Sequence, residues 1–228
     1  MNKTIVVVGA SRGIGKSIVT LLAEESSNKI IALSRNLTKM KAQFAKYENV
    51  SCFALDLNQS DVRTQCESIF DEILSIDILI NNAGKLINKP FTELSREEIQ
   101  ECYNVNIIGV IQTTQAALYK MNKAHIVNIS SIGGFQGSVK FPGLSAYSSS
   151  KAALCSFTEM FSEEYKNTDI TMNCLCLGAV QTEMFQEAFP GHEAPVSASK
   201  MAEYIVHFAM TANDWVRGKI IPVTLSTP

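Results

Sequence analysis

The sequence predicts one doubly wound α/β domain, with a mainly parallel sheet of seven strands and helices on both faces. Short apolar segments alternate with longer amphipathic segments along the 228 residues. The apolar segments are nearly continuous in hydrophobic residues, which is typical of strands buried on both faces of a parallel sheet. No linker, repeat or low-complexity tract divides the chain. Residues 1–228 are therefore expected to form a single domain.

The expected elements follow this alternation in order. The strands are predicted at residues 4–8, 30–33, 50–55, 76–80, 125–129, 170–176 and 219–223. The helices are predicted at residues 13–25, 37–46, 59–74, 96–121, 146–166 and 197–210. Two less regular segments, residues 133–144 and 181–197, are rich in Gly, Pro and Ser. Loops of this kind in an α/β domain commonly determine specificity.

Charge and hydropathy argue against two classes of partner. A net charge of −2 gives no electrostatic reason to expect nucleic acid. No apolar run approaches the length that spans a membrane. The apolar run at residues 4–8 is too short for the core of a signal peptide, and a glycine turn follows it directly. We therefore expect a cytoplasmic protein with no membrane or nucleic acid partner.

The cysteines and histidines give no metal motif. The six cysteines form no C-x-x-C pair and mostly lie in predicted strands or helices, which favours buried free thiols. Cys174 and Cys176 alternate on one strand, but we expect no further ligand beside them. The three histidines are scattered at positions 125, 192 and 207. The sequence thus predicts no metal site.

A glycine-rich turn, within the stretch VVVGASRGIGKS, joins the first predicted strand to the first helix. Gly9 stands where the chain must turn tightly, and Gly13 and Gly15 leave the start of the helix bare. A bare helix N-terminus offers free N–H groups and the positive end of the helix dipole, which suits a pyrophosphate. Ser11 and Arg12 can add a hydroxyl and a cation. The turn therefore predicts a dinucleotide-binding site.

The end of the second predicted strand indicates which dinucleotide is preferred. Ser34, Arg35 and Asn36 stand where an NAD-preferring domain usually has Asp or Glu to bind the ribose 2′-OH. An acidic side chain would repel a 2′-phosphate, whereas Arg35 would attract it through charge-assisted hydrogen bonds. Arg12 is placed where a second cation could reach the same phosphate. We therefore expect NADP(H) in preference to NAD(H).

Four further motifs follow the glycine turn in order. They are NNAG at residues 81–84, NVN ending at Asn106, NISS ending at Ser131 and YSSSK at residues 147–151. Together with GASRGIG they make the sequence resemble the short-chain dehydrogenase/reductase family, from Thr4 to about Val223. A lone Y-x-x-x-K pattern is weak, but five motifs in order on a matching framework are highly specific. The resemblance implies a Rossmann fold and an oxidoreductase that interconverts carbonyl and alcohol groups.

The predicted catalytic residues are Asn106, Ser131, Tyr147 and Lys151. Tyr147 and Lys151 are four residues apart and share one helix face. A nearby ammonium, and the positive nicotinamide of the oxidised cofactor, would lower the pKa of Tyr147 toward neutrality. Ser131 follows the fifth strand, where its hydroxyl can hold a substrate oxygen. The resemblance implies that Asn106 holds a water linked to Lys151, that Lys151 binds the nicotinamide ribose, and that Tyr147 donates a proton while NADPH donates hydride.

The resemblance also assigns the cofactor contacts. Residues 56–57 match a pair that meets the adenine, residues 82–84 match a segment along the adenosine ribose, and LCLGAVQT matches a segment beside the nicotinamide. The predicted cofactor-binding residues are Gly9, Ser11, Arg12, Gly13, Ile14, Gly15, Arg35, Asp56, Leu57, Asn82, Ala83, Gly84, Tyr147, Lys151, Gly178, Val180 and Thr182.

The chain departs from the family pattern in four places. Cys176 and Leu177 replace the usual Asn and Pro, so a looser turn is expected on the nicotinamide side. The connection from Ser131 to Tyr147 is longer than usual, which alters the pocket wall. The loop after Thr182 is short, which predicts a small lid. The ending RGKIIPVTLSTP lacks a Gly-Gly pair that many members carry.

Two other functions remain as alternatives to a carbonyl reductase or alcohol dehydrogenase. A non-enzymatic NADP(H) sensor or scaffold would have no need of the complete set of four catalytic residues. A sugar-nucleotide epimerase or dehydratase would add a C-terminal substrate domain, which the length of the chain opposes.

Substrate and assembly are predicted only in outline. Aromatic and apolar residues in the two irregular segments are consistent with an apolar pocket for a carbonyl or alcohol, although such residues in loops more often only pack; they are Phe135, Phe141, Met184, Phe185 and Phe189. The helices predicted at residues 96–121 and 146–166 carry apolar residues on more than one face. The resemblance implies that they pair across a two-fold axis. A homodimer or homotetramer is expected, with the tetramer less supported because of the altered ending.

Overall fold

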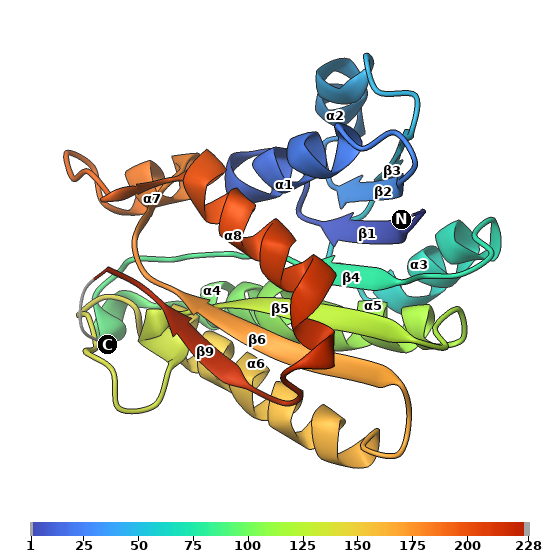
Figure 1. Ribbon diagram of the computed structural model, residues 1–228. Coiled ribbons are helices and arrows are strands. Elements are labelled where there is room, and N and C mark those ends of the chain that lie inside the picture. Colours follow the sequence, from blue (N-terminus) through green and yellow to red (C-terminus); the bar gives the residue numbers. More distant parts are fainter. Residues whose placement is uncertain (1, 226–228) are drawn as a thin grey trace.

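A seven-stranded sheet forms the centre of the protein, which the computed structural model describes over residues 2–225 (Figure 1). The strands lie in the order β3-β2-β1-β4-β5-β6-β9, and every neighbouring pair is parallel. They are β1 (Thr4–Val8), β2 (Lys29–Ser34), β3 (Val50–Ala54), β4 (Ile78–Asn81), β5 (Ala124–Ser131), β6 (Ile170–Leu177) and β9 (Ile220–Val223). The predicted fold class is confirmed.

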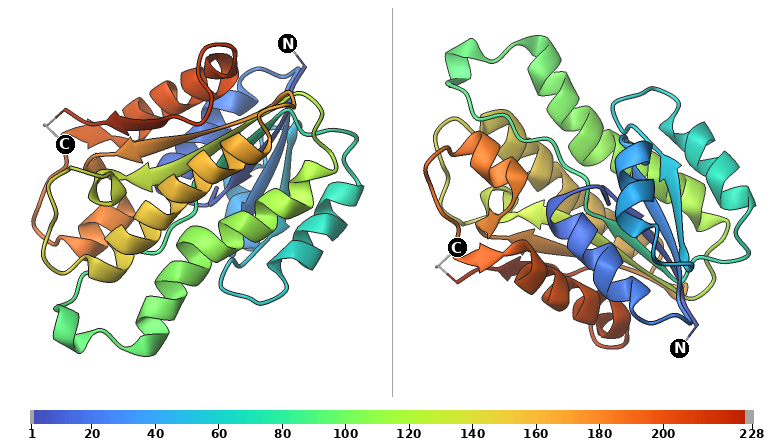
Figure 2. Two further views of the ribbon diagram at one scale, coloured as in Figure 1. Left: turned by 90° about the horizontal axis from the view of Figure 1, so that it is seen from below. Right: turned by 90° about the horizontal axis from the view of Figure 1, so that it is seen from above.

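Helices cover both faces of the sheet (Figure 2). One face carries α1 (Gly13–Ala23), α2 (Leu37–Phe44) and α8 (Ala198–Thr211), and the other carries α3 (Val62–Asp71), α4 (Arg96–Tyr103), α5 (Gly109–Leu118) and α6 (Ser145–Glu164). Alternation along β1 separates the two cores: Ile5 and Val7 face the first, and Val6 and Val8 face the second. The near-continuous apolar strands are therefore explained by burial on both sides.

The strand order reverses between β1 and β4, and this positions the site. The chain moves outward from β1 through β2 to β3, then returns to add β4 on the other side of β1. In an open α/β sheet, such a reversal leaves a crevice at the carboxyl ends of the strands, where ligands bind. The glycine turn after β1 and the NNAG motif after β4 both lie at this end.

The helix predicted at residues 96–121 is not one continuous α-helix. It begins with a capping box, in which Ser95 accepts from Glu98 N–H and Glu98 caps Ser95 in return. A π-helical turn, Asn104–Ile108, then separates α4 from α5. Turns of this kind inside helices are rare and are frequent at functional sites. Here the turn carries Asn106, which is fully buried.

The segment at residues 181–197 is more ordered than the sequence indicates. It contains the short helix α7 (Glu183–Ala188), and a two-stranded parallel pairing of β7 (Val180–Gln181) with β8 (Val196–Ser197) flanks that helix. Residues 133–144 contain mainly turns after a short 3-10 helix, Ile132–Gly134. Among the described residues, no helix is both long and apolar enough to cross a membrane.

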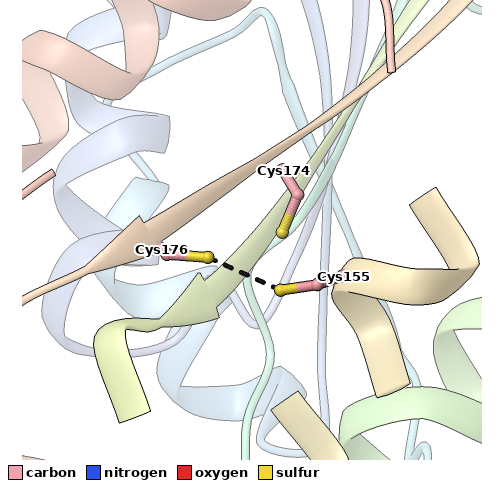
Figure 3. A group of neighbouring side chains, drawn as sticks. All are labelled: Cys155, Cys174 and Cys176. Atoms are coloured by element: carbon pink, nitrogen blue, oxygen red, sulfur yellow. Dashed lines mark hydrogen bonds between the residues drawn. The ribbon is translucent and has the colours of Figure 1, made fainter. Parts of the chain in front are cut away.

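The expectation that Cys174 and Cys176 have no further ligand beside them was wrong. Cys155 of α6 packs onto β6 and brings its sulfur to 3.5 Å from the Cys176 sulfur (Figure 3). This contact depends on how α6 packs against β6, and so local spacing could not predict it.

Candidate active site

A cavity of about 580 Å³ opens at the carboxyl ends of the strands. It runs from the glycine turn and Arg35 at one end to Tyr147 and the α7 segment at the other. Of the predicted catalytic and cofactor-binding residues, all line this cavity except Gly15 and Asn106, which are placed just behind it. Residues far apart in the sequence are thus brought together in one crevice.

The glycine turn has the close packing that its motif predicts. Gly9 has a φ of +86°, and a Cβ there would lie 2.6 Å from the Cα of Ala83. A Cβ on Gly15 would lie 2.1 Å from the carbonyl oxygen of Gly9. The side chain of Asn82 donates to the same oxygen at 3.1 Å, which ties the turn to the end of β4. Any larger side chain at Gly9 or Gly15 would push the turn apart.

The open N-terminus of α1 and a group of cations form the end of the site nearest β2. Arg12 is the N-cap residue of α1, and its side chain makes no capping hydrogen bond. Arg12, Arg35 and Lys39 all line a polar recess of about 500 Å³ that adjoins the main cavity. Sequence analysis missed Lys39. Its position could have indicated this role, because Lys39 lies in the first turn of α2, three residues after the N-cap Asn36.

Arg12 also connects the glycine turn to α7. Both terminal nitrogens of its guanidinium donate to the carboxylate of Glu187, one of them at 3.1 Å. The hydrogen bond with Glu187 raises the pKa of Arg12 and lowers that of Glu187. Nothing in the local sequence around Glu187 predicts this ion pair, because it spans the mouth of the cavity.

Ser131, Tyr147 and Lys151 meet on the cavity wall where β5 ends and α6 begins. Burial raises the pKa of Tyr147 to about 12, although a hydrogen bond with Ser131 opposes the shift. The ammonium of Lys151 donates to the carbonyl oxygen of Ile129 at 2.8 Å. Burial lowers the pKa of Lys151 to about 8. In the protein alone, desolvation therefore outweighs the local hydrogen bond, and the lowered pKa of Tyr147 beside the oxidised cofactor stays a prediction.

Asn106 fixes the chain beside the catalytic residues. Its amide nitrogen donates to the Lys85 carbonyl and to Ser150 Oγ, both at 2.9 Å, and its oxygen accepts from Lys85 N–H at 2.8 Å. A Cβ on Gly84 would lie 3.5 Å from both the Asn106 oxygen and the Lys151 nitrogen. The predicted neighbourhood of Asn106 and Lys151 is thus present. The oxygen keeps a second lone pair for the water that was predicted there.

The turn on the nicotinamide side is held by the sheet. Leu177 pairs with Val223 across β6 and β9, and Gly178 N–H donates to the Val223 carbonyl at 2.9 Å. Thr182 caps α7 by accepting from Phe185 N–H at 3.1 Å. We expected a looser turn where Leu177 replaces proline. The hydrogen bond from Gly178 ties the start of this turn to β9, and the looser turn itself stays a prediction.

The remaining cavity wall is largely apolar. Phe141, Met184, Phe185 and Phe189 line it as predicted, and sequence analysis missed Leu86, Leu144 and His192. Phe135 was assigned to this pocket wrongly, since it packs against the buried cysteines behind β6. Three further charged residues reach the wall: Glu183, and the pair Lys85 and Glu101, which form an ion pair at 2.9 Å.

The comparisons with known proteins agree with this geometry. A family model described as short chain dehydrogenase matches residues 3–193. A 3-oxoacyl-(acyl-carrier-protein) reductase FabG of Chlamydia trachomatis is 33% identical over 192 residues, covering 81% of this chain and 76% of that protein. An NADP-dependent 3-hydroxy acid dehydrogenase of Schizosaccharomyces pombe is 33% identical over an alignment of 247 residues, which covers 99% of this chain and 92% of that protein.

Solved structures share the whole fold. The structure titled ElxO with NADP bound matches with a TM-score of 0.84 at 26% identity, covering 98% of this chain and 97% of that one. The family match spans most of the chain and includes the glycine turn and all four predicted catalytic residues. The chain therefore belongs to the short chain dehydrogenase family of oxidoreductases.

Proposed function

We propose that the protein is an NADP(H)-dependent oxidoreductase that transfers hydride between the cofactor and a carbonyl or alcohol substrate, with Tyr147 as the acid and base. The observation that carries this proposal is the shared cavity. It joins the open N-terminus of α1 and Arg35 at one end to Ser131, Tyr147 and Lys151 at the other, and the adjoining recess adds Lys39 and Arg12, of which Arg12 is paired with Glu187. A pure binding protein would need only the first of these two ends.

The glycine turn and its cations fit NADP(H). The turn has no room for side chains at Gly9 and Gly15, so the backbone of α1 is exposed to a pyrophosphate. Arg35 and Lys39 stand beside the recess where a ribose 2′-phosphate would lie, and no acidic residue ends β2. Two relatives support the choice, because one is named as NADP-dependent and another was solved with NADP bound.

The chain's own residues account for the proton in carbonyl reduction. Bound NADPH supplies the hydride for the carbonyl carbon. The Ser131 hydroxyl orients the carbonyl oxygen, and the Tyr147 phenol, protonated at neutral pH, gives its proton to that oxygen. Lys151, charged below a pKa of about 8, stabilises the phenolate left on Tyr147 and supplies the replacement proton. Asn106 holds the water through which Lys151 exchanges protons with solvent.

The apolar wall favours substrates with an apolar part beside the carbonyl. Leu86, Phe141, Met184 and Phe185 face the space next to the reacting residues. Two of the relatives that match this chain are named for 3-oxoacyl and 3-hydroxy acid substrates. These two classes therefore come first in a substrate search.

The test is NADPH oxidation by purified protein with a panel of 3-oxoacyl thioesters, 3-oxo esters, ketones, aldehydes and quinones. Turnover with at least one carbonyl, at a rate well above the background oxidation of NADPH, is expected. Tight NADPH binding without turnover across the panel would favour the non-enzymatic sensor or scaffold. Failure to bind either cofactor would contradict both.

A further inference from the structure

Three buried cysteines lie together behind the catalytic helix (Figure 3). Cys155 projects from α6, and Cys174 and Cys176 project from the same face of β6 because they are two residues apart on a strand. Their sulfur atoms all lie within 4.8 Å of one another. Cys155 is 8% exposed, and the other two are fully buried. We refer to these three residues as the thiol cluster.

The surroundings of the thiol cluster are dry and offer few other hydrogen-bond partners. Phe135 and Ile220 pack against it. The Ser130 hydroxyl lies 3.5 Å from the Cys155 sulfur, and this hydroxyl itself donates to the Lys151 carbonyl.

The spacing of the sulfurs matches that of a metal–thiolate site. Thiolates bound to one zinc-like ion at 2.3 Å are separated by about 3.8–4.0 Å, in tetrahedral or trigonal geometry. The cluster has one sulfur pair at 3.5 Å, and its largest separation is within 4.8 Å, so a common ligation sphere needs only small side-chain rotations. We propose that the thiol cluster binds a single thiophilic metal ion, of the zinc, cadmium or copper(I) class.

A disulfide explains the arrangement less well. It would join only two of the three sulfurs, and the nearest pair would have to close from 3.5 Å to a bond of about 2 Å. The third cysteine would then have no role. A metal ion uses all three, and Ser130 Oγ is placed to serve as a weaker fourth ligand.

The charge of a bound ion is balanced nearby. Binding a divalent ion releases three thiol protons to solvent and leaves a metal–trithiolate unit with a net charge of −1. Lys151 supplies a compensating positive charge, since it lies one helical turn before Cys155 on α6. The three cysteines themselves do not line the cavity, so uptake of a metal ion can be measured without the proposed reaction.

The test uses Cd²⁺ alone as the probe, on the full chain reduced and desalted without oxygen. We expect one equivalent to bind, with thiolate-to-cadmium charge-transfer absorption and a ¹¹³Cd resonance characteristic of three sulfur ligands. At about a hundredfold excess over the dissociation constant, the thermal midpoint should rise by roughly 5–10 °C. Cys155→Ser, Cys174→Ser and Cys176→Ser should each weaken binding by about a hundredfold or more.

Cys66→Ser is the matched control, because Cys66 is also fully buried but lies on α3 away from the cluster. It should keep wild-type affinity for Cd²⁺. Should a cluster variant fail to fold, the ¹¹³Cd resonance and stoichiometry of the wild-type protein still decide the question. Absence of uptake by the reduced wild-type protein would overturn the proposal, as would uptake that all three cluster variants retain. A disulfide within the cluster, formed in air in a protein whose reduced form takes up no Cd²⁺, would also overturn it.

Discussion

Burial shifts Tyr147 and Lys151 in opposite directions, and this sets the pH behaviour of the site. An uncharged phenol with a pKa of about 12 stays protonated, ready to act as an acid. A buried ammonium with a pKa of about 8 is charged at neutral pH but is close to losing its proton. Of these two residues, Lys151 is therefore the one whose protonation state changes close to neutral pH.

Carbonyl reduction should fall as pH rises through about 8. Below that pH, Lys151 carries the charge that stabilises the Tyr147 phenolate; above it, Lys151 is neutral, and kcat should drop roughly tenfold per pH unit. The measurement is kcat from about pH 6.5 to 9.5 at saturating NADPH. In Lys151→Arg, any remaining activity should lack this inflection, since an arginine stays charged throughout. An identical inflection in that variant would assign the titration to another group.

Arg35 is the residue expected to select the cofactor. Arg35→Asp removes a charge-assisted contact with the 2′-phosphate and places a negative charge beside it. NADPH binding should weaken by roughly ten- to a hundredfold, or about 1.5–3 kcal/mol. NADH binding should be unchanged or improved, because the new carboxylate can accept from a ribose hydroxyl. Fluorescence titration with both cofactors measures the ratio, and an unchanged ratio would show that Lys39 or Arg12 selects instead.

At the scale of elements, the π-helical turn Asn104–Ile108 is the clearest case of a local irregularity that positions a site. It directs Asn106 into the interior, where three hydrogen bonds fix the backbone of Lys85 and the Ser150 hydroxyl. An uninterrupted α-helix would rotate the following residues by a fraction of a turn. The irregularity therefore sets the relation between α4 and α5 as well as the position of one side chain.

Asn106→Ala should lower both stability and turnover. It leaves the N–H and C=O of Lys85 without their side-chain partner in a largely buried site, which costs about 2–4 kcal/mol in the free energy of unfolding. Denaturant unfolding and steady-state kinetics measure the two effects. Asn104→Ala is the matched control, since Asn104 lies in the same turn but bonds an exposed side chain, Asn58. Equal losses in the two variants would contradict the assignment.

Motifs and periodicity predicted the sheet and its helices, and nearly all of the predicted site residues line the cavity, because these depend on local pattern and on parallel strands sharing one edge. Contacts between a helix or loop and the element that it packs against could not be predicted from local pattern. The Arg12–Glu187 ion pair, the third cysteine beside β6 and the place of Phe135 each depend on how a helix or loop packs. The desolvation that raises the pKa of Tyr147 was also beyond such reasoning, because a sequence shows neighbours along a helix but not burial.

At the scale of the whole molecule, two large apolar side chains beside α5 and on α6 are exposed. Ile108, in the π-helical turn that leads into α5, is 46% exposed, and Met160 of α6 is 66% exposed. Isolated apolar residues on a surface are ordinary, but these two lie on the helices predicted to pair across a two-fold axis. A homodimer through this face remains our prediction.

Introducing negative charges on this face should separate the subunits. The double variant Ile108→Glu and Met160→Glu places like charges together at a two-fold contact, where they repel. Light scattering at micromolar concentration should give a dimer for the wild type and a monomer for the variant. Trp215→Glu is a suitable control, because Trp215 is 85% exposed and lies after α8 on the other face of the sheet. A wild-type monomer would contradict the prediction.

The central claim is that Tyr147 supplies the proton in a cavity that also binds NADPH, and Tyr147→Phe tests it most directly. The substitution keeps the ring and removes only the hydroxyl. The account predicts that NADPH affinity changes little, while kcat with any accepted carbonyl falls by about a hundred- to ten-thousandfold. A variant that retains full turnover would show that the proton comes from elsewhere, and would contradict the account.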